Sequence, residues 1–416
     1  MINHFPLAGS GSGTYTRNLA VHLTALGHEV CVILPENTDD YERVEGVRLH
    51  PVFFAPEDEP NEAGAVSDAD GTTMADAIPF NFPCFTSHPR STMTFADLNE
   101  AQLAQYTRAF TRAIDEEIAA DKPDIVHGQH VWILPALAAG RGIPLVLTAH
   151  GTDLMGYNKW PHLRPYAQTA MDACSAVISI SKDNCQLLGE IWPDQQDKVV
   201  MMRNGYDPGI MYPEELTREE VLGDYVIAPD EYEDRNIVLF AGKLAHFKGV
   251  DILLDAVKEY ETEKPATLTL IAGDGDERDA LHAQAEELGL QTVHFLGNVQ
   301  IQKLRRLYNI ADVSLVPSRR EPFGLVAIEA MACGTPVIAT NQGGLPDFVN
   351  ENVGALVEPE NAHDLAQTIL RMLERLQHCD VTVWRKEIAS YARTHYAQDM
   401  IIKELEDLYR KAVGSA

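Results

Sequence analysis

Short apolar segments of strand length alternate with segments of helical spacing along almost the whole chain, and this alternation limits the possible folds most strongly. The apolar segments form a first series at residues 28–34, 124–127, 144–149, 176–180 and 198–202, and a second at 237–241, 267–272, 293–296, 313–317 and 336–340. Strands that alternate with helices form parallel sheets that are covered by helices on both faces. The pattern predicts two successive, doubly wound α/β domains, joined by a polar connector at about residues 207–235.

Composition excludes several classes of function. The chain of 416 residues is long enough for two domains, and its 62 acidic against 33 basic side chains give a net charge of −29 that would repel a nucleic acid. No apolar stretch approaches the roughly 20 residues that a membrane-spanning helix needs. The first residues lack the basic and apolar regions of an export signal, and the six cysteines are scattered. We therefore expect reduced thiols in a cytoplasmic protein.

The densest group of chemically informative residues lies at 320–340. There the segment Glu321-Pro-Phe-Gly-Leu-Val-Ala-Ile-Glu329 precedes an apolar Gly-Thr-Pro-Val-Ile-Ala run. The turn at 323–325 opens a predicted helix, whose first N–H groups lack partners and attract anions. The two carboxylates are suited to a different task, because they accept hydrogen bonds from hydroxyl groups. Recognition of phosphate beside a polyol indicates a nucleotide sugar as the ligand.

This segment resembles the Glu-x7-Glu motif of retaining glycosyltransferases of the GT-B fold, sugar-transferase family 4, and the turn at 343–347 extends the resemblance. The resemblance implies an α/β, GT-B fold, in which two Rossmann-like domains with doubly wound parallel sheets face each other across a cleft. It assigns residues 1–206 to an acceptor-side domain and residues 207–390 to a nucleotide-sugar domain. Residues 391–416 would form a helix that crosses back to the first domain, with Tyr409 as the family's usual terminal tyrosine.

Two parts of the chain depart from the family pattern. Only residues 1–5 precede Pro6 and the glycine-rich segment, where the family has a full first strand. We expect either a very short strand or further residues upstream, and we favour the second. Residues 55–95 form a long insertion without periodicity, and such loops are usually functional or disordered. Its acidic first half is expected to be flexible, and its aromatic second half to be ordered and to face the acceptor.

A glycine-rich segment at residues 9–14 precedes a helical pattern. Glycines let the backbone approach a ligand closely. In the family this loop approaches the donor phosphate or the acceptor, so the resemblance implies that Gly11 and Gly13 lie near the donor and Thr14 near the acceptor. The spacing differs from the G-x-G-x-x-G fingerprint of dinucleotide sites. Glu36 nevertheless stands near the end of the next strand, where such a site has an acidic residue, so a nicotinamide-dependent enzyme stays open.

His150 stands at the carboxyl end of a predicted strand, where the sites of α/β proteins gather. The sequence from His150 to Asp153 resembles the family's His-Gly-x-Asp element, whose histidine contacts the donor sugar. We expect Asp153 to hold the turn or cap the next helix, with acceptor contact as an alternative. Asn204 marks the crossover between the domains.

Lys243 and Lys248 follow the first strand of the second domain and are flanked by glycines. Two such cations suit a diphosphate that leaves with its negative charge. The family usually has arginine at the first position, and Lys243 keeps the charge but loses the bidentate fork. Gly273-Asp274-Gly275 and the strand before them are predicted to form the floor of the nucleotide pocket, and Gly242 is predicted to bind the donor.

Together, the motifs predict a retaining hexosyltransferase that moves a hexose or an N-acetylhexosamine from a nucleoside diphosphate sugar, UDP before GDP, to a hydroxyl acceptor. The predicted catalytic residues are His150, Lys243, Lys248 and Glu321. The predicted donor-binding residues are Gly11, Gly13, Gly242, Gly273, Phe323, Gly324, Leu325 and Glu329, and the expected acceptor contacts are Asp153, Thr14 and Asn204. We expect neither a cofactor nor a catalytic metal, because the lysines already supply positive charge and no Asp-x-Asp follows a strand in a metal-holding position.

Several questions stay open at this level. The acceptor is a small molecule, a lipid or a glycan, and only a lipid would bring the protein to a membrane surface. Whether the protein forms a homodimer is also an open question. A GT-B phosphorylase or a nucleotide-sugar epimerase would share the fold, and formation of an epimer without acceptor would identify the latter. A two-lobed solute-binding protein also has paired α/β domains, but it should have an export signal.

Overall fold

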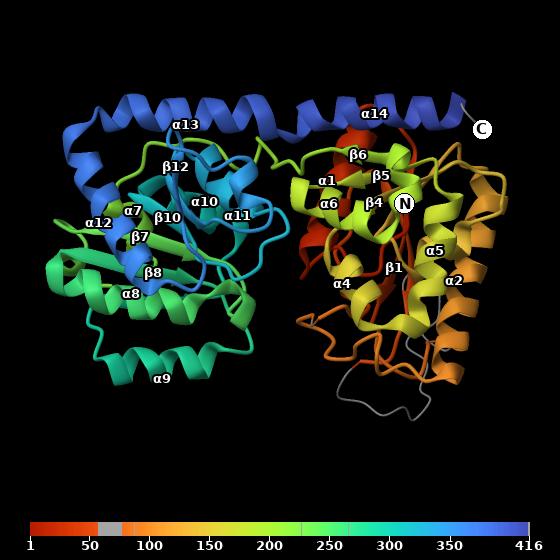
Figure 1. Cartoon of the computed structure of the whole chain (residues 1–416), viewed down its shortest axis with the longest axis horizontal. Coiled ribbons are helices and arrows are strands. Elements are labelled where there is room, and N and C mark those ends of the chain that lie inside the picture. The colour runs from red at the N-terminus through yellow and green to blue at the C-terminus, as the bar shows by residue number, and fades with distance from the viewer. Residues whose placement is uncertain (57–76, 87, 226, 265, 415–416) are drawn as a thin grey trace. The chain divides into compact units, whose positions relative to one another are not determined.

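The computed structural model describes residues 1–56, 77–86, 88–225, 227–264 and 266–414 (Figure 1). The acidic half of the insertion, with Glu57, lies outside the described residues. The chain divides into two compact units. The first comprises Met1–Ile180, Asn184–Arg203 and Ile401–Ala416, and the second comprises Ser181–Asp183 and Asn204–Met400.

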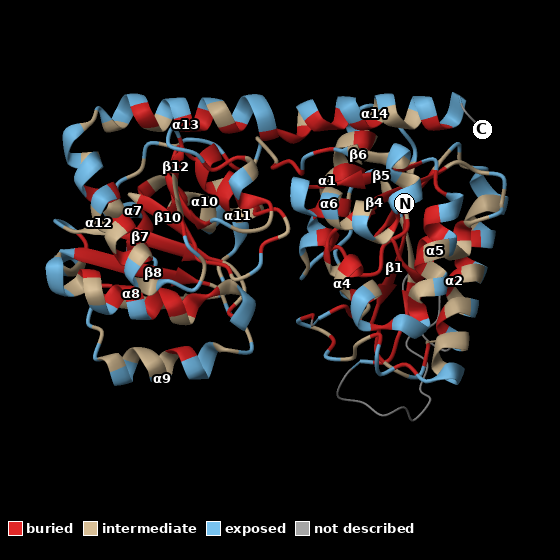
Figure 2. Ribbon diagram, in the orientation of Figure 1, coloured by how far each residue is buried: buried red, intermediate tan, exposed pale blue. Residues whose placement is uncertain are grey.

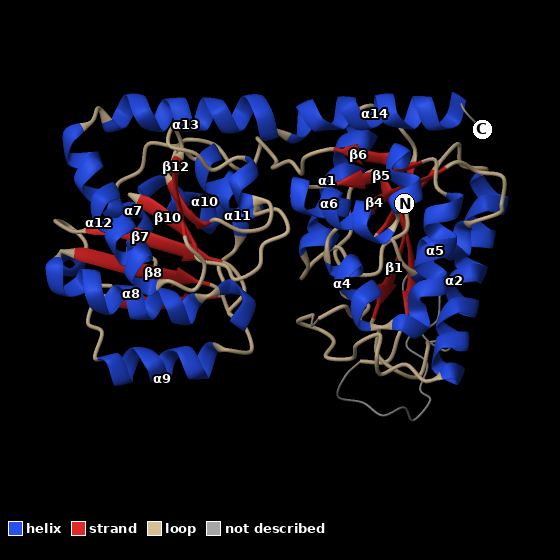
Figure 3. Cartoon of the chain, in the orientation of Figure 1, coloured by secondary structure: helices blue, strands red, loops and turns tan. Residues whose placement is uncertain are grey.

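A parallel sheet forms the centre of the first unit (Figure 3). Its strands are β1 (Val30–Glu36), β2 (Val47–Phe53), β3 (Val126–Gln129), β4 (Leu145–Ala149), β5 (Ala176–Ser179) and β6 (Val199–Met201). Strand β2 pairs with β1, and β3, β4, β5 and β6 pair in chain order. Residue Ile2 pairs in parallel with both Ile33 of β1 and Gly128 of β3, so the first residues join the two parts. The first strand is therefore present in a very short form.

Helices and the ordered half of the insertion surround this sheet. The helices are α1 (Gly11–Ala25), α2 (Glu100–Asp121), α3 (Ile133–Ala138), α4 (Thr152–Lys159), α5 (Arg164–Ala173) and α6 (Lys182–Ile191). The insertion's aromatic residues Phe82, Phe85 and Phe95 belong to the unit's main hydrophobic cluster. Figure 2 shows that the strands at the centre of this unit are mostly buried. Burial of each phenylalanine side chain contributes about 1.5–3 kcal/mol to stability. This contribution accounts for an ordered conformation of the insertion without regular secondary structure.

The second unit contains one six-stranded parallel sheet. Its strands are β7 (Asn236–Ala241), β8 (Thr267–Ala272), β9 (Val293–Gly297), β10 (Val313–Val316), β11 (Val337–Thr340) and β12 (Gly354–Val357). The order is β12-β11-β10-β7-β8-β9, which is the doubly wound order. The direction of winding reverses between β7 and β10, and ligands of such sheets bind at the carboxyl ends of the strands beside that reversal.

The helices of the second unit include one, α7, that lies within the predicted connector. They are α7 (Arg218–Leu222), α8 (Val250–Glu263), α9 (Arg278–Leu288), α10 (Ile301–Ile310), α11 (Leu325–Ala332), α12 (Ala362–His378) and α13 (Val381–Tyr396). The polar segment at 207–235 contains α7, whose Val221 and Leu222 are buried, and Arg218 pairs with Asp312 at 3.0 Å. The segment predicted as a polar connector therefore packs against the second unit, to which the predicted bounds 207–390 also assign it.

Two helices form the C-terminal part instead of one continuous helical segment. Ala397 is extended and pairs with Tyr206, which ends α13 before α14 (Gln398–Gly414) begins. From Ile401 on, α14 packs in the first unit, where the Tyr409 hydroxyl lies 2.6 Å from Nδ1 of His127. Burial lowers the pKa of His127 to about 3, so this contact involves a neutral ring. Among the described residues, no helix has both the length and the apolar character to cross a membrane.

Candidate functional site

Three loops of the second unit meet at the carboxyl edge of its sheet. The loop after β7 carries Lys243 and Lys248, and the loop after β10 carries Glu321. These strands are neighbours at the reversal of the sheet order. The loop after β8 joins them, because the Leu244 N–H donates to the carbonyl of Asp274 at 2.9 Å. The fold thus brings the predicted cations and the predicted carboxylate to the place where doubly wound sheets bind ligands.

Lys248 and Glu321 form an ion pair. The distance from Nζ of Lys248 to Oε2 of Glu321 is 2.5 Å, and the two side chains are only 18% and 10% exposed. The Ser318 hydroxyl lies 3.4 Å from the same carboxylate oxygen, and the Gly344 N–H donates to the Glu321 carbonyl at 2.9 Å. Charges with this little exposure are costly when unpaired, so each side chain requires either the other or a ligand group of opposite charge.

Glycines allow the backbones of these loops to touch. A Cβ on Gly273 would lie 1.8 Å from the carbonyl oxygen of Gly242, and a Cβ on Gly343 would lie 2.0 Å from that of Glu321. Gly249, directly after Lys248, has a φ of +69° and would place a Cβ 2.1 Å from the Pro317 carbonyl. Only glycine fits such contacts. Gly273, predicted as part of the pocket floor, therefore has a structural reason to be glycine, and Gly242 has one in its φ of +154°.

Helix α11 begins at Leu325, and Gly324 with a φ of +103° precedes it. The first N–H groups of a helix have no partners within the helix, so this end can bind an anion. The side chain of Phe323 is buried, with ring centroids 5.7 Å from Phe348 and 6.5 Å from Tyr396. Any contact of Phe323 with a ligand therefore involves its backbone, whereas Leu325 is partly exposed.

Glu329 lies further along α11 and is only partly exposed. Among the described residues, no side chain or backbone group forms a hydrogen bond or an ion pair with its carboxyl group. Burial raises the pKa of Glu329 to about 7, so the group ionises near neutral pH. A partly exposed carboxyl group without a protein partner is suited to accept hydrogen bonds from ligand hydroxyls.

Lys243 is held less firmly than Lys248. Its Nζ lies 3.4 Å from Oδ2 of Asp276, which is 73% exposed. Surface pairs of this kind contribute about 0–1 kcal/mol, so the ammonium group is able to exchange this partner for a ligand.

The glycine-rich segment of the first unit is helical earlier than its sequence indicates. Helix α1 begins at Gly11, because the hydroxyl of Ser10 caps it by accepting the Gly13 N–H at 3.0 Å. Gly11, Gly13 and Thr14 thus lie in the first helical turn rather than in a loop. A Cβ on Gly13 would lie 2.2 Å from the Pro6 carbonyl, whereas one on Gly11 would have no neighbour within 4 Å.

Alanine substitutions should separate these two glycines. Gly13→Ala should lower the free energy of unfolding by several kcal/mol or prevent folding, because its methyl group meets a backbone oxygen. Gly11→Ala should raise it by roughly 0.5–1 kcal/mol, since alanine replaces glycine in a helix without a clash. Urea denaturation measures both. A loss of donor binding by a stable Gly11→Ala variant would support the predicted ligand contact, and unchanged binding would contradict it.

His150 lies at the end of β4 and is almost completely buried. Its Nε2 is 2.9 Å from Oε1 of Gln129, and its ring centroid is 4.7 Å from that of His130 and 5.2 Å from that of Tyr15. Burial lowers the pKa of His150 to about 3, so the ring is neutral at physiological pH. It is suited to hydrogen bonding with a sugar rather than to donating a proton. Gln129, which orients the ring, was not among the predicted site residues.

Asp153 is completely buried, and its Oδ2 accepts the Val131 N–H at 2.7 Å. Gly151 is the residue that precedes α4, so Asp153 ties the loop after β3 to this helix instead of capping it. Burial raises the pKa of Asp153 to about 6. Asn204 is buried in the second unit, and its Oδ1 has no partner among the described residues.

Glu36 was the acidic residue on which a dinucleotide site depended. Its side chain is 2% exposed, and its Oε2 lies 2.7 Å from NH1 of Arg90, which comes from the insertion. The carboxylate is therefore occupied by a protein cation and is not available to ribose hydroxyls. This contact removes the main support for a nicotinamide-dependent enzyme.

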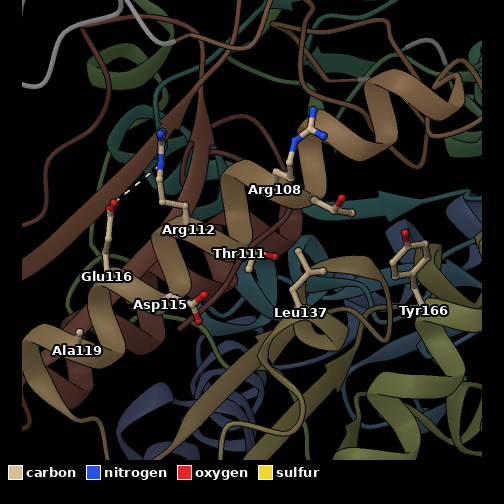
Figure 4. A pocket seen from close by; sticks show the side chains of 9 residues that line it. Arg108, Thr111, Arg112, Asp115, Glu116, Ala119, Leu137 and Tyr166 are labelled. Atoms are coloured by element: carbon tan, nitrogen blue, oxygen red, sulfur yellow. Dashed lines mark ion pairs between the residues drawn. The ribbon is translucent and has the colours of Figure 1, made fainter.

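Two hollows of the first unit lie away from these residues. One of about 810 Å³ lies over α2 and is lined by Arg108, Thr111, Arg112, Asp115, Glu116, Ala119, Leu137 and Tyr166 (Figure 4). The other, of about 980 Å³, includes Cys31, Arg48 and Tyr409 in its wall. Neither contains a predicted site residue. Within the described part of the chain, no three His, Cys, Asp or Glu side chains are grouped so as to hold a metal ion.

Solved structures with the same arrangement identify the fold. The chain is similar to sucrose-phosphate synthase from Thermosynechococcus elongatus, with a TM-score of 0.75, 22% identity and coverage of 100% of this chain and 99% of that one. It is also similar to HepE from Anabaena in complex with UDP and glucose, with a TM-score of 0.70, 18% identity and coverage of 98% of both chains. The fold is GT-B, a fold of glycosyltransferases.

Sequence comparisons place the chain more narrowly. Residues 10–205 match the glycosyl transferase 4-like domain, and residues 226–385 match glycosyl transferases group 1. An uncharacterized glycosyltransferase of Methanocaldococcus jannaschii is 28% identical over 427 residues, covering 98% of this chain and 96% of the relative. D-inositol 3-phosphate glycosyltransferase of Mycolicibacterium smegmatis is 32% identical over 303 residues, covering 68% and 67%. The chain belongs to the glycosyl transferase group 1 family and is a glycosyltransferase.

Proposed function

We propose that the protein is a retaining glycosyltransferase that moves a hexose or an N-acetylhexosamine from a UDP-sugar to a hydroxyl acceptor. The observation that carries this proposal is the Lys248–Glu321 ion pair at the carboxyl edge of the second sheet. A cation suited to a diphosphate beside a carboxylate suited to sugar hydroxyls supports a nucleotide sugar as the donor.

Each part of the donor has a matching group in the second unit. Lys243, Lys248 and the first N–H groups of α11 supply positive charge and hydrogen-bond donors for the diphosphate. Glu321 accepts hydrogen bonds from the sugar, and Glu329 accepts them from the ribose. In the first unit, the neutral His150 binds the sugar through a hydrogen bond.

In the proposed reaction, the bond between the sugar's anomeric carbon and the diphosphate oxygen breaks while the acceptor oxygen bonds to the same face of that carbon. The acceptor's hydroxyl proton passes to the departing phosphate, so atoms and charge balance. A covalent intermediate would need a carboxylate that attacks the sugar. Asp153 is fully buried and one of its oxygens accepts the Val131 N–H, which supports direct transfer over such an intermediate. Stabilisation of the departing diphosphate is then the main catalytic contribution of the protein.

The nucleotide and the acceptor require direct measurement. HepE was solved with UDP-glucose, whereas a starch synthase of similar fold was solved with ADP, so related folds take different nucleotides. Thermal shifts with UDP-, GDP- and ADP-sugars identify the donor, and mass spectrometry with hydroxyl acceptors detects the product. A new glycoside with retained anomeric configuration supports the proposal, and an inverted product refutes retention. Formation of an epimer without acceptor supports an epimerase instead.

The elevated pKa of Glu329 predicts how donor affinity depends on pH. Ribose hydroxyls bind better to the carboxylate than to the neutral acid, so binding below pH 7 requires the loss of a proton. Affinity for UDP-glucose should therefore increase between pH 6 and pH 8, by up to roughly tenfold. Calorimetry measures this change, and Glu329→Gln should bind more weakly with no such dependence. An unchanged pH profile in that variant would show that another group titrates.

Metal removal should have little effect on turnover. The lysines and the start of α11 already supply positive charge, and no group of described residues is arranged to hold a metal ion. We expect product formation in excess EDTA to stay within about twofold of the untreated rate. Complete loss with EDTA, restored by Mn²⁺, would contradict the proposed role of the lysines.

A further inference from the structure

We propose that Arg319 is a positioning residue, which sets the spacing between Lys248 and Glu321 and thereby controls the rate of sugar transfer. The inference rests on the proposed function of this pair. Arg319 precedes the Glu321 motif and is not among the predicted site residues.

All three guanidinium nitrogens of Arg319 have partners in the described structure. NH1 and NH2 donate to the two carboxylate oxygens of Asp251, both at 2.7 Å. NH1 also donates to the carbonyl of His246 at 2.8 Å, and Nε donates to Oε1 of Glu360 at 2.9 Å. The side chain is 17% exposed, so water screens these contacts only in part.

Two of these partners, His246 and Asp251, flank Lys248 in the sequence. His246 precedes it in the same turn, and Asp251 lies in the first turn of α8 just after it. The backbone adds a further link, because the Arg319 N–H donates to the Phe247 carbonyl at 2.8 Å. Arg319 thus holds the turn that carries Lys248, while Glu321 follows two residues later on Arg319's own loop.

A second set of contacts fixes the loop on the side of Glu321. The Gln342 amide donates to the Arg319 carbonyl, and the Thr340 hydroxyl donates to the Ser318 carbonyl at 2.6 Å. The β10 loop is therefore anchored to residues at the end of β11. With both loops held, the distance of 2.5 Å between Nζ of Lys248 and Oε2 of Glu321 depends on the fork of Arg319.

Arginine is required here for its shape as well as its charge. A planar guanidinium binds both oxygens of a carboxylate and a carbonyl at once, whereas a lysine ammonium reaches fewer of these partners in fixed directions. Burial acts to raise the pKa of Asp251, but the hydrogen bonds and charge of Arg319 outweigh it and hold that pKa below its usual value. The Asp251 carboxylate thus stays ionised as the anchor of the fork.

The chain offers a matched control for the loss of an arginine fork. Arg393 also binds both oxygens of one carboxylate, that of Asp399, at 2.7 and 2.8 Å. Neither residue is among the predicted site residues. Arg393→Ala removes a guanidinium of the same geometry without a direct link to the Lys248 or Glu321 loops.

Steady-state kinetics of Arg319→Ala, Arg319→Lys and Arg393→Ala test the proposal. Misplacement of reacting groups by about 1 Å costs on the order of a hundredfold, so kcat of Arg319→Ala should fall by roughly 30- to 100-fold. Arg319→Lys should recover part of that loss, and Arg393→Ala should stay within about twofold of wild type. UDP affinity, measured by calorimetry, should change little in all three. Wild-type kcat in Arg319→Ala, or loss only through weaker UDP binding, would overturn the proposal.

A double-mutant cycle separates positioning from general damage to the fold. If Arg319 acts through Lys248, then Arg319→Ala should cost within about threefold in a Lys248→Ala background. Full additivity of the two losses would overturn the inference. Acetylation of Lys248 in the free protein, followed by mass spectrometry, gives a readout without turnover: the labelling rate should increase severalfold in Arg319→Ala and not in Arg393→Ala. An unchanged rate overturns the positioning role, whereas failure of the proposed function appears as a wild type without transferase activity.

Discussion

Replacing Lys248 with alanine is expected to lower kcat by roughly a hundred- to a thousandfold, because one charge-assisted donor to the leaving group is lost, at a cost of about 3–4 kcal/mol. The diphosphate gains negative charge as the glycosidic bond breaks, so a cation directed at it acts mainly in the transition state. The KM for the donor should therefore change less than kcat. Steady-state kinetics with a saturating acceptor measure both quantities.

The ion pair adds a second reason for a large effect. Without Lys248, the carboxylate of Glu321 has little exposure and lacks its counter-ion, so its position and charge both change. Lys243→Arg is the comparison, since it keeps a cation after β7 and should stay within about threefold of wild type. A kcat of Lys248→Ala within threefold of wild type would mean that the diphosphate does not contact this loop.

The central strands of both sheets could be predicted from sequence, whereas two edge strands could not. The predicted segments 267–272 and 313–317 correspond to β8 and β10, whose side chains are all buried and are mostly apolar, with only small hydroxyl residues among them. Strand β2 lies at an edge of its sheet and contains Arg48 and Pro51, and β12, also at an edge, has four residues and begins with glycine. Edge strands tolerate such residues, so the sequences of β2 and β12 lack the apolar signal.

The site shows the same division between local and long-range information. The positions of Lys248, Glu321 and His150 after strands follow from local patterns, because a parallel sheet brings such loops to one edge. Their partners depend on tertiary packing. Nothing near Glu36 in the sequence indicates Arg90, and nothing near Arg319 indicates Asp251, although both contacts decide how the site is interpreted. The neutrality of His150 likewise arises from burial among residues distant in sequence.

Glu321→Gln should lower kcat by roughly 10- to 150-fold, the range expected when a hydrogen bond to a charged group of about 1.5–3 kcal/mol is lost. Glutamine preserves the shape of the side chain but removes the negative charge that pairs with Lys248 and accepts sugar hydroxyls. Because UDP lacks the transferred hexose, its affinity should stay within about twofold of wild type, while affinity for UDP-glucose should decrease.

Comparison with Glu329→Gln makes this prediction specific, since Glu329 is assigned to the ribose that both ligands share. That variant should lose affinity for UDP and UDP-glucose alike, whereas Glu321→Gln should discriminate between them. Calorimetry with both ligands on both variants measures the difference. An equal loss of UDP and UDP-glucose binding in Glu321→Gln would place this carboxylate against the nucleotide, and the assignment of the sugar to the Lys248–Glu321 pair would then be wrong.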